Sequence, residues 1–184
     1  MSRPGWVDVR GFSITELVLT VGIAATLAAI AVPALNAVSD ATKLSNAAQQ
    51  VERTLQTARM RAVSQNSPLR VRTNCPTTGY YRVTEVTGTS ADNSRSRCDI
   101  SSYPWPASTD VSSTTHLDGQ LRQMINNATV SDQWLEFRPD GTARYVDPTT
   151  FAATPIATTV SVTVTRNGQS KTITINALGK VLLQ

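Results

Sequence analysis

The stretch that decides the fold lies near the N-terminus, where residues 11–35 read GFSITELVLTVGIAATLAAIAVPAL. The 19 residues from Leu17 to Leu35 include no charged side chain. A helix of that length spans close to 30 Å, at roughly 1.5 Å per residue, and this is the thickness of a bilayer's hydrocarbon core. The segment therefore predicts one membrane-spanning helix.

The charges on either side of this segment predict its orientation. Arg3 and Arg10 precede it, and the first basic residue after it, Lys43, comes only after Asp40. Basic residues flanking a span stay on the cytoplasmic side. We therefore expect a single-pass protein of a bacterial inner membrane, with its C-terminal part in the periplasm.

Two other kinds of N-terminal segment share the apolar run. A plain membrane anchor needs only this run and a basic flank. A secretory signal peptide is the other alternative, because Ala29-Ile30-Ala31 offers a cleavage site that would release a soluble, secreted protein. Neither accounts for Glu16, a carboxylate that costs about 2 to 3 kcal/mol at depth in a membrane and marks a functional position by default.

The order Gly11-Phe12, then Glu16, then the apolar run resembles the N-terminus of type IV pilins and pseudopilins. The resemblance implies that a prepilin peptidase cuts after Gly11 and that Phe12 becomes an N-methylated terminus. It also implies that Glu16 faces the terminal amine of a neighbouring subunit. Pro33 matches a helix-bending proline of many pilins, since proline removes one helix hydrogen bond. The implied partners are the peptidase, other pilins or pseudopilins in a filament, and an inner-membrane assembly platform.

After the membrane stretch, apolar residues recur at steps of three and four, which predicts that an amphipathic helix continues to about Gln65 and packs on the C-terminal part of the chain. Asn66-Ser67-Pro68 ends this helix, because proline disfavours helical geometry in the residue before it. The members of the apolar stripe are Val38, Ala41, Leu44, Ala48, Val51, Leu55, Ala58 and Ala62.

The rest of the chain reads as strands and turns. Pro139-Asp140-Gly141 and Asn167-Gly168 are turn signals that should pair neighbouring strands as hairpins. The predicted fold class is α+β: a long N-terminal transmembrane helix packed on a small, mainly antiparallel β-sheet domain, as in pilins. Strands are expected at 69–73, 80–86, 134–138, 143–146, 159–166 and 171–183, the last broken by Gly179.

These predictions define the expected domain organisation. A prepilin leader occupies 1–11, a helix 12–66 and a periplasmic β-rich domain 67–184. The helix divides into a transmembrane part at 12–35 and an amphipathic part at 36–66. A long surface loop at 87–119, rich in Ser, Thr, Asp and Pro, interrupts the β-rich domain.

Within prepilins, LEFRPDGTA at 135–143 and the closing ITINALGKVLL at 173–183 resemble the GspH/FimT group. In that group a glycine, a basic residue and an aliphatic residue form a turn near the end of the chain. Gly179, Lys180 and Val181 match this pattern. The resemblance implies a pseudopilin or a minor pilin.

Cys75 and Cys98 are the two cysteines of the chain and lie outside the apolar segment. A zinc site needs four ligands, whereas the chain offers one histidine, so a periplasmic disulfide is the better interpretation. Its closed loop of about 24 residues would add roughly 3 kcal/mol of stability in the chain-entropy account.

Nothing in the sequence calls for a catalytic site, a cofactor or a metal. His116, the one histidine, sits in the polar loop, and no nucleophile or phosphate-binding motif appears. In the same loop, Tyr103 and Trp105 either dock the loop onto the domain or form an exposed recognition element. We expect a protein that is not an enzyme.

Two functional classes remain. The first is a structural subunit of a type II secretion pseudopilus or a type IV pilus. The second is a minor pilin that binds DNA for uptake in natural transformation, which needs basic residues against phosphates. The formal net charge of +4 is too small to favour DNA, and Leu182 stands where DNA-binding relatives carry a second arginine. The candidate phosphate contacts are Arg138, Arg144, Arg166, Lys171 and Lys180.

Overall fold

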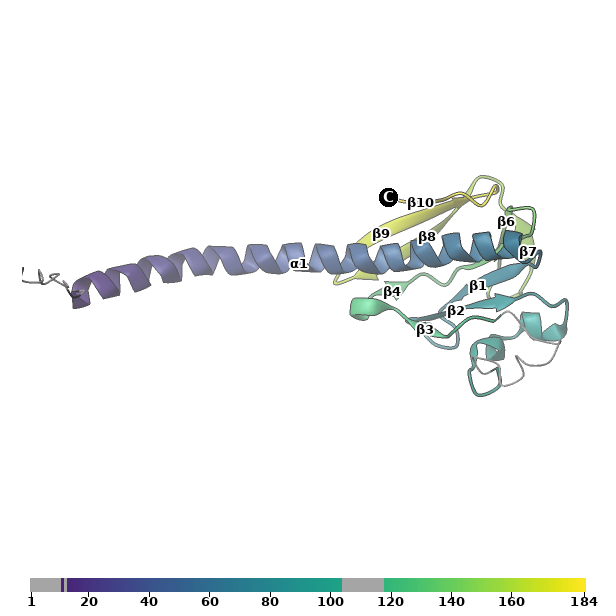
Figure 1. The fold of residues 1–184 in the computed structure, drawn as a ribbon, viewed down its shortest axis with the longest axis horizontal. Helices are drawn as coiled ribbons and strands as arrows, with labels where there is room; N and C mark the ends of the chain where they lie inside the picture. Colours follow the sequence, from purple (N-terminus) through teal and green to yellow (C-terminus); the bar gives the residue numbers. More distant parts are fainter. Residues whose placement is uncertain (1–10, 12, 104–117) are drawn as a thin grey trace, which may run out of the picture. The chain divides into compact units, whose positions relative to one another are not determined.

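The computed structural model describes residues 11, 13–103 and 118–184 (Figure 1). The chain forms two units, Met1–Ser39 and Asp40–Gln184. Helix α1, Ile14–Ser64, contributes its first part to one unit and its second part to the other. It ends just before Pro68, as the sequence predicts.

In the first unit, α1 is an apolar helix whose described residues are exposed. Every described residue from Gly11 to Ser39 is exposed. The hydroxyls of Thr20 and Thr26 donate to the carbonyls of Leu17 and Ile23, so these polar groups are satisfied within the helix. Within the described chain, α1 is the one helix long and apolar enough to cross a membrane, judged by length and composition.

In the second unit, one face of α1 enters the core. Of the predicted stripe, Val38 and Ala41 stay exposed, and the packed face begins at Leu44. Half of its buried side chains are alanines, and this small size lets strands approach the helix closely. The buried residues of the helix are Leu44, Ala47, Ala48, Val51, Thr54, Leu55, Ala58 and Ala62.

The strands form two antiparallel sheets where the sequence predicts one. The six-stranded sheet has the order β3-β2-β1-β5-β6-β7, and the four-stranded sheet has the order β10-β9-β8-β4. Sequence periodicity identifies strands and hairpins, but it does not specify which hairpins join edge to edge. Strand bounds in the six-stranded sheet are β1 Leu69–Thr73, β2 Tyr80–Glu85, β3 Arg122–Gln123, β5 Trp134–Phe137, β6 Ala143–Val146 and β7 Ala153–Pro155. Those in the other sheet are β4 Thr129–Val130, β8 Thr159–Arg166, β9 Gln169–Asn176 and β10 Val181–Leu183.

Both predicted hairpin turns are present. Residues 139–141 join β5 to β6, and Asn167-Gly168 joins β8 to β9. Asn167 and Gly168 both have positive φ, at 48° and 77°, as a two-residue turn of this hand requires. The described residues also form three short 3₁₀ helices: η1 Ser90–Asn93, η2 Arg95–Cys98 and η3 Ile125–Asn127. Thus the start of the predicted loop at 87–119 has helical turns of its own.

A single main core joins the helix to both sheets. Figure 1 shows the second half of α1 between the yellow strands of the four-stranded sheet and the teal strands β1 and β2. Apolar side chains from β1, β5, β8 and β9 meet the helix there. Those buried to 2% or less are Leu69, Val71, Leu135, Phe137, Val162, Val164, Ile173 and Ile175.

One helix side chain ties the ends of two hairpins. Arg59 donates from Nε to the carbonyl of Gly141 at 3.0 Å and from Nη2 to the carbonyl of Leu178 at 2.9 Å. The backbone of Gly179, at φ +70°, passes so close that an added Cβ would overlap the Gly141 oxygen and lie 2.8 Å from Arg59 Nε. The closing turn therefore needs glycine for both conformation and space.

We expect Gly179→Ala to lower the free energy of unfolding by about 3 kcal/mol, from backbone strain plus overpacking. Gly168→Ala is a matched control, because Gly168 also has positive φ but a Cβ there would meet nothing within 4 Å. Chemical denaturation of both variants measures the difference. Equal losses would show that the contact with Arg59 and Gly141 carries no energy of its own.

Candidate functional site

The first candidate site is the start of α1. Glu16 lies in the first turn of the helix and makes no hydrogen bond or ion pair with any described residue. Leu17, Val18 and Leu19, which come next in the helix, are more than half exposed. An unpaired carboxylate beside an exposed apolar surface is costly to desolvate, and the described residues supply no partner for it.

Gly11, Phe12 and Pro33 are the other N-terminal positions that the sequence singles out. Gly11 is exposed and a Cβ there would meet nothing within 4 Å, so packing does not require glycine at this position. Phe12 lies outside the described residues. The helix is continuous through Pro33, which therefore does not end it.

A second candidate site is a charged layer on the face of the six-stranded sheet opposite the helix. Strand alternation directs Leu69 and Val71 to the core and Arg70 and Arg72 to the other face. Four arginines are 4% exposed or less: Arg70, Arg72, Arg82 and Arg97. Strand register sets two rows, Arg82–Arg72–Trp134 and Thr84–Arg70–Glu136.

These arginines hold the segment η1–η2 by its backbone. Arg70 Nη1 and Arg72 Nη2 both donate to the carbonyl of Asp92, at 2.7 and 2.8 Å, and Arg72 Nη1 donates to that of Ser94. Arg82 Nη1 donates to the carbonyl of Arg97 at 3.1 Å. Hydrogen bonds from charged donors are stronger than those between neutral groups, so these contacts fix the position of the η1–η2 segment on the sheet.

Two carboxylates pair with arginines of this layer and offset part of its positive charge. Glu136 Oε2 lies 2.8 Å from Arg70 Nη2, and Asp118 Oδ2 lies 3.0 Å from Arg97 Nε, with all four side chains nearly buried. Burial, together with the charges of Arg70 and Arg97, lowers the pKa of the Arg72 guanidinium to about 9. Arg72 therefore still carries its charge at neutral pH.

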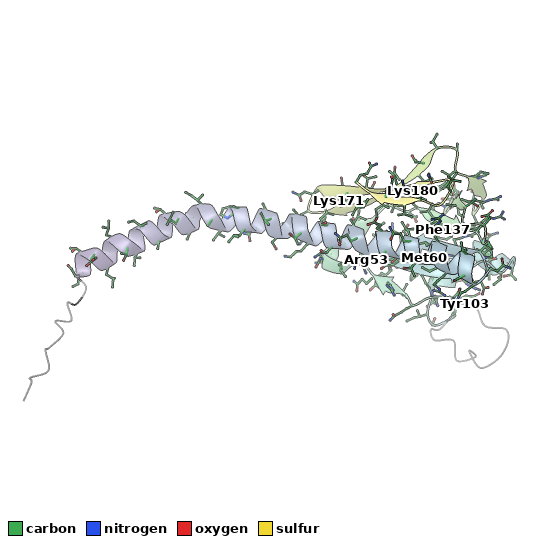
Figure 2. All side chains as sticks on the ribbon, turned by 45° about the horizontal axis from the view of Figure 1, so that its top comes forward. Arg53, Met60, Tyr103, Phe137, Lys171 and Lys180 are labelled. Atoms are coloured by element: carbon green, nitrogen blue, oxygen red, sulfur yellow. A yellow bond between two sulfur atoms is a disulfide. The ribbon has the colours of Figure 1, made fainter. Side chains whose placement is uncertain are left out.

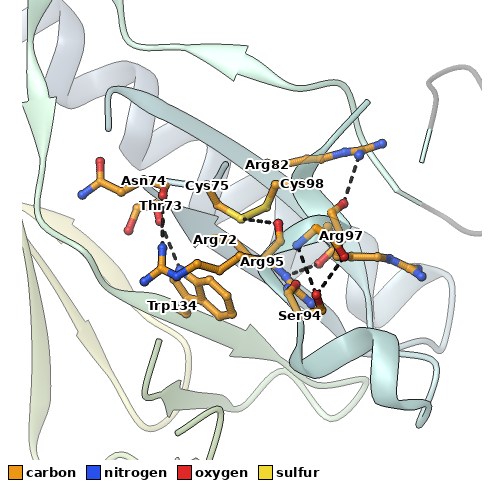
Figure 3. The surroundings of a disulfide bond; sticks show 12 residues. Arg72, Thr73, Asn74, Cys75, Arg82, Ser94, Arg95, Arg97, Cys98 and Trp134 are labelled. Carbon is orange, nitrogen blue, oxygen red and sulfur yellow. Dashed lines mark hydrogen bonds between the residues drawn. A yellow bond between two sulfur atoms is a disulfide. The ribbon is translucent and has the colours of Figure 1, made fainter. Parts of the chain in front are cut away.

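The predicted disulfide closes this layer. Cys75 and Cys98 are bonded and fully buried beside Trp134 (Figure 3). The Trp134 ring lies 4.7 Å from the guanidinium carbon of Arg72 and 5.5 Å from that of Arg95. Tyr103 packs on Arg97 in the same way at 4.7 Å, so it docks its segment onto the domain. Trp105 lies outside the described residues.

Sequence reasoning did not identify the charged layer, because LRVRT and YYRVTE read as strands with one face toward solvent. The sequence did carry a signal for this layer. Arginines recur on the predicted polar faces of both strands, and arginines also stand a few residues before each cysteine.

The five basic residues proposed for DNA come from several elements, and two of them lie near carboxylates. Arg138 and Arg144 belong to the β5–β6 hairpin, and Arg138 Nε lies 3.9 Å from Glu136. Lys171 is on β9 and Lys180 is in the turn between β9 and β10; Figure 2 labels both. Arg166 Nη1 lies 2.6 Å from Asp40 Oδ1, and the hydrogen bonds from Arg166 and Asn167 lower the pKa of the Asp40 carboxyl.

A metal site among the described residues would need a cluster of side chains that could bind the ion. Among those residues, no group of three His, Cys, Asp or Glu side chains could hold a metal ion. His116 lies outside them.

Comparison with known proteins gives a family match and a distant structural likeness. The family model described as Type II transport protein GspH matches residues 47–179, more than half of the chain. Two crystal structures of the type IV minor pilin FimU from Pseudomonas aeruginosa are similar at 15% sequence identity, with TM-scores of 0.46 and 0.47. The two alignments cover 77% and 79% of this chain and 92% and 91% of FimU. No curated protein matches the chain.

Proposed function

Because this chain belongs to the GspH family of type II transport proteins, we propose that it is a pseudopilin or minor pilin, a structural subunit that assembles through its N-terminal helix. The family description favours the pseudopilus of a type II secretion system, and a type IV pilus is the other machine that uses such a subunit. No catalytic step is part of this proposal.

The observation that carries the proposal is the unpaired Glu16 at the head of an apolar helix surface that no described part of the chain covers. A bilayer covers such a surface in the free subunit, and neighbouring helices cover it in a filament. The family match begins only at residue 47, so it is independent of this segment. Two separate parts of the chain thus support the same role.

The proposed mechanism begins with cleavage after Gly11 by a prepilin peptidase. The new amine of Phe12 is methylated and pairs with Glu16 of a neighbouring subunit. Each of these charges costs free energy when desolvated, and pairing them offsets part of that cost. The axial stagger that aligns them is then preferred, and an inner-membrane assembly platform adds subunits in that register. The β-rich unit faces the periplasm.

A role in DNA uptake has less support. Arg166 is held by Asp40, and Arg138 lies near Glu136, while the candidates divide between the two sheets. A phosphate-contacting face needs several uncommitted basic side chains on one surface.

N-terminal processing tests the proposal directly. When the full chain is expressed with a prepilin peptidase, we expect the mature protein to begin at Phe12 with a methylated amine, because Gly11, Phe12 and Glu16 match the processed pattern. Intact-mass measurement and N-terminal sequencing detect this. A mature terminus at Val32 would instead establish the secretory signal and exclude filament assembly through this helix.

A further inference from the structure

A hollow of about 310 Å³ lies between the second half of α1 and the edge of the six-stranded sheet formed by β2 and β3. Arg53, Thr57 and Arg61 line it from the helix, at intervals of four residues, which places them in one row along the helix surface. Figure 2 labels Arg53 on this part of the helix.

The sheet contributes a third guanidinium. Arg122 on β3 pairs in register with Tyr81 on β2, so both side chains lie on the same face of the sheet. Tyr81 belongs to the core beside the helix, and both residues line the hollow. The hollow thus has arginines on its helix wall and on its sheet wall.

The described lining of the hollow is positively charged. No acidic side chain lines it among the residues that the structure describes. Within that part of the chain, Arg53 and Arg122 make no hydrogen bond or ion pair, unlike Arg59, Arg70, Arg72, Arg82, Arg97 and Arg166. Like charges around one concavity repel each other, and an anion between them relieves that repulsion.

The wall also holds an unsatisfied polar atom. Tyr81 is 2% exposed, and its hydroxyl oxygen is buried without a hydrogen-bond partner among the described residues. Buried hydroxyls in folded proteins normally have a partner. A residue that lines the hollow thus carries a buried hydroxyl without a partner among the described residues.

We propose that this hollow is a binding site for a small polyanion, recognised through carboxylate or phosphate oxygens by Arg53 and Arg122. The planar guanidinium matches both groups, because its N–H donors pair with two oxygens at once. The volume suits a compact ligand, at the lower end of the range for small-molecule sites. This site is separate from Glu16 and does not depend on the assembly proposal.

The test is calorimetric titration of the full chain in uncharged detergent with citrate and, separately, with inorganic pyrophosphate at matched ionic strength. We expect saturable binding of at least one probe, weakened about tenfold or more by Arg53→Gln and by Arg122→Gln, since each removes a charged hydrogen-bond donor. Both variants should keep the melting temperature of the parent chain, because neither side chain has a partner among the described residues to lose.

Lys171→Gln is the matched control, since it removes one positive charge from the four-stranded sheet. It should leave binding unchanged. Binding of citrate alone identifies a carboxylate ligand, binding of pyrophosphate alone a phosphate ligand, and binding of both a general oxyanion site. The proposal is overturned if neither probe saturates, or if Lys171→Gln weakens binding as much as the arginine variants do.

Discussion

Glu136→Ala is expected to lower the free energy of unfolding by about 3 to 5 kcal/mol, the cost of leaving a buried charge without its partner. Glu136 is 5% exposed and faces Arg70, which is 4% exposed. Without the carboxylate, Arg70 keeps one hydrogen bond, to the carbonyl of Asp92, and its Nε already lacks a partner among the described residues. The nearby charge of Arg72 adds repulsion.

Chemical denaturation followed by circular dichroism measures this loss. Asp132→Asn is the matched control, because Asp132 pairs with Arg95 at 2.9 Å while both side chains are more than a third exposed. An exposed pair of that kind contributes at most about 1 kcal/mol. Similar losses in the two variants would contradict the view that burial of Glu136 sets the effect.

A double variant tests whether the loss comes from the unpaired charge of Arg70. Arg70→Met with Glu136→Leu replaces both charges by apolar side chains, and replacement of a buried pair in this way is often close to neutral. We expect it to recover most of the stability lost in Glu136→Ala. A double variant as unstable as Glu136→Ala would assign the loss to the hydrogen bond that Arg70 makes to the carbonyl of Asp92.

The elements that the sequence predicts are those set by local pattern. The helix stripe from Leu44 to Ala62 follows from apolar spacing, and its end follows from Pro68. The two hairpins follow from turns in which glycine or asparagine supplies positive φ. Each signal lies within a few residues of its structural consequence.

The features that the sequence does not predict depend on pairs that are distant along the chain. Arg70 and Arg72 alternate with core residues and so resemble solvent-facing positions, until η1 and η2 cover them. Likewise the sequence does not show that Arg166 is paired, because its partner Asp40 lies 126 positions away. Charge alone does not reveal whether a partner satisfies it.

The candidate sites also differ in whether they depend on local sequence or on residues that are distant along the chain. Glu16 is identifiable from sequence because an acid at the head of an apolar run is costly wherever the chain folds. The arginine-lined hollow is not identifiable in this way, because Arg53 and Arg122 meet only through the packing of the helix on β2 and β3. Burial and pairing, which decide function for arginine, are properties of the fold.

Glu16→Ala is expected to abolish assembly while leaving membrane insertion intact. Glu16 makes no contact with another described residue that folding would lose, and removing the carboxylate favours insertion by about 2 to 3 kcal/mol if the residue lies deep, less near the interface. Leader cleavage should continue, since Gly11 remains, whereas the amine of Phe12 in a neighbouring subunit loses its counter-charge.

Glu52→Ala is the control, because Glu52 is an acid of the same helix outside the apolar run. Both variants and the parent chain are expressed with the complete assembly machinery and compared by membrane fractionation, leader cleavage and cross-linking into filaments. Normal cross-linking of Glu16→Ala would remove Glu16 as the docking group, and an equal loss in Glu52→Ala would show that assembly responds to helix charge in general.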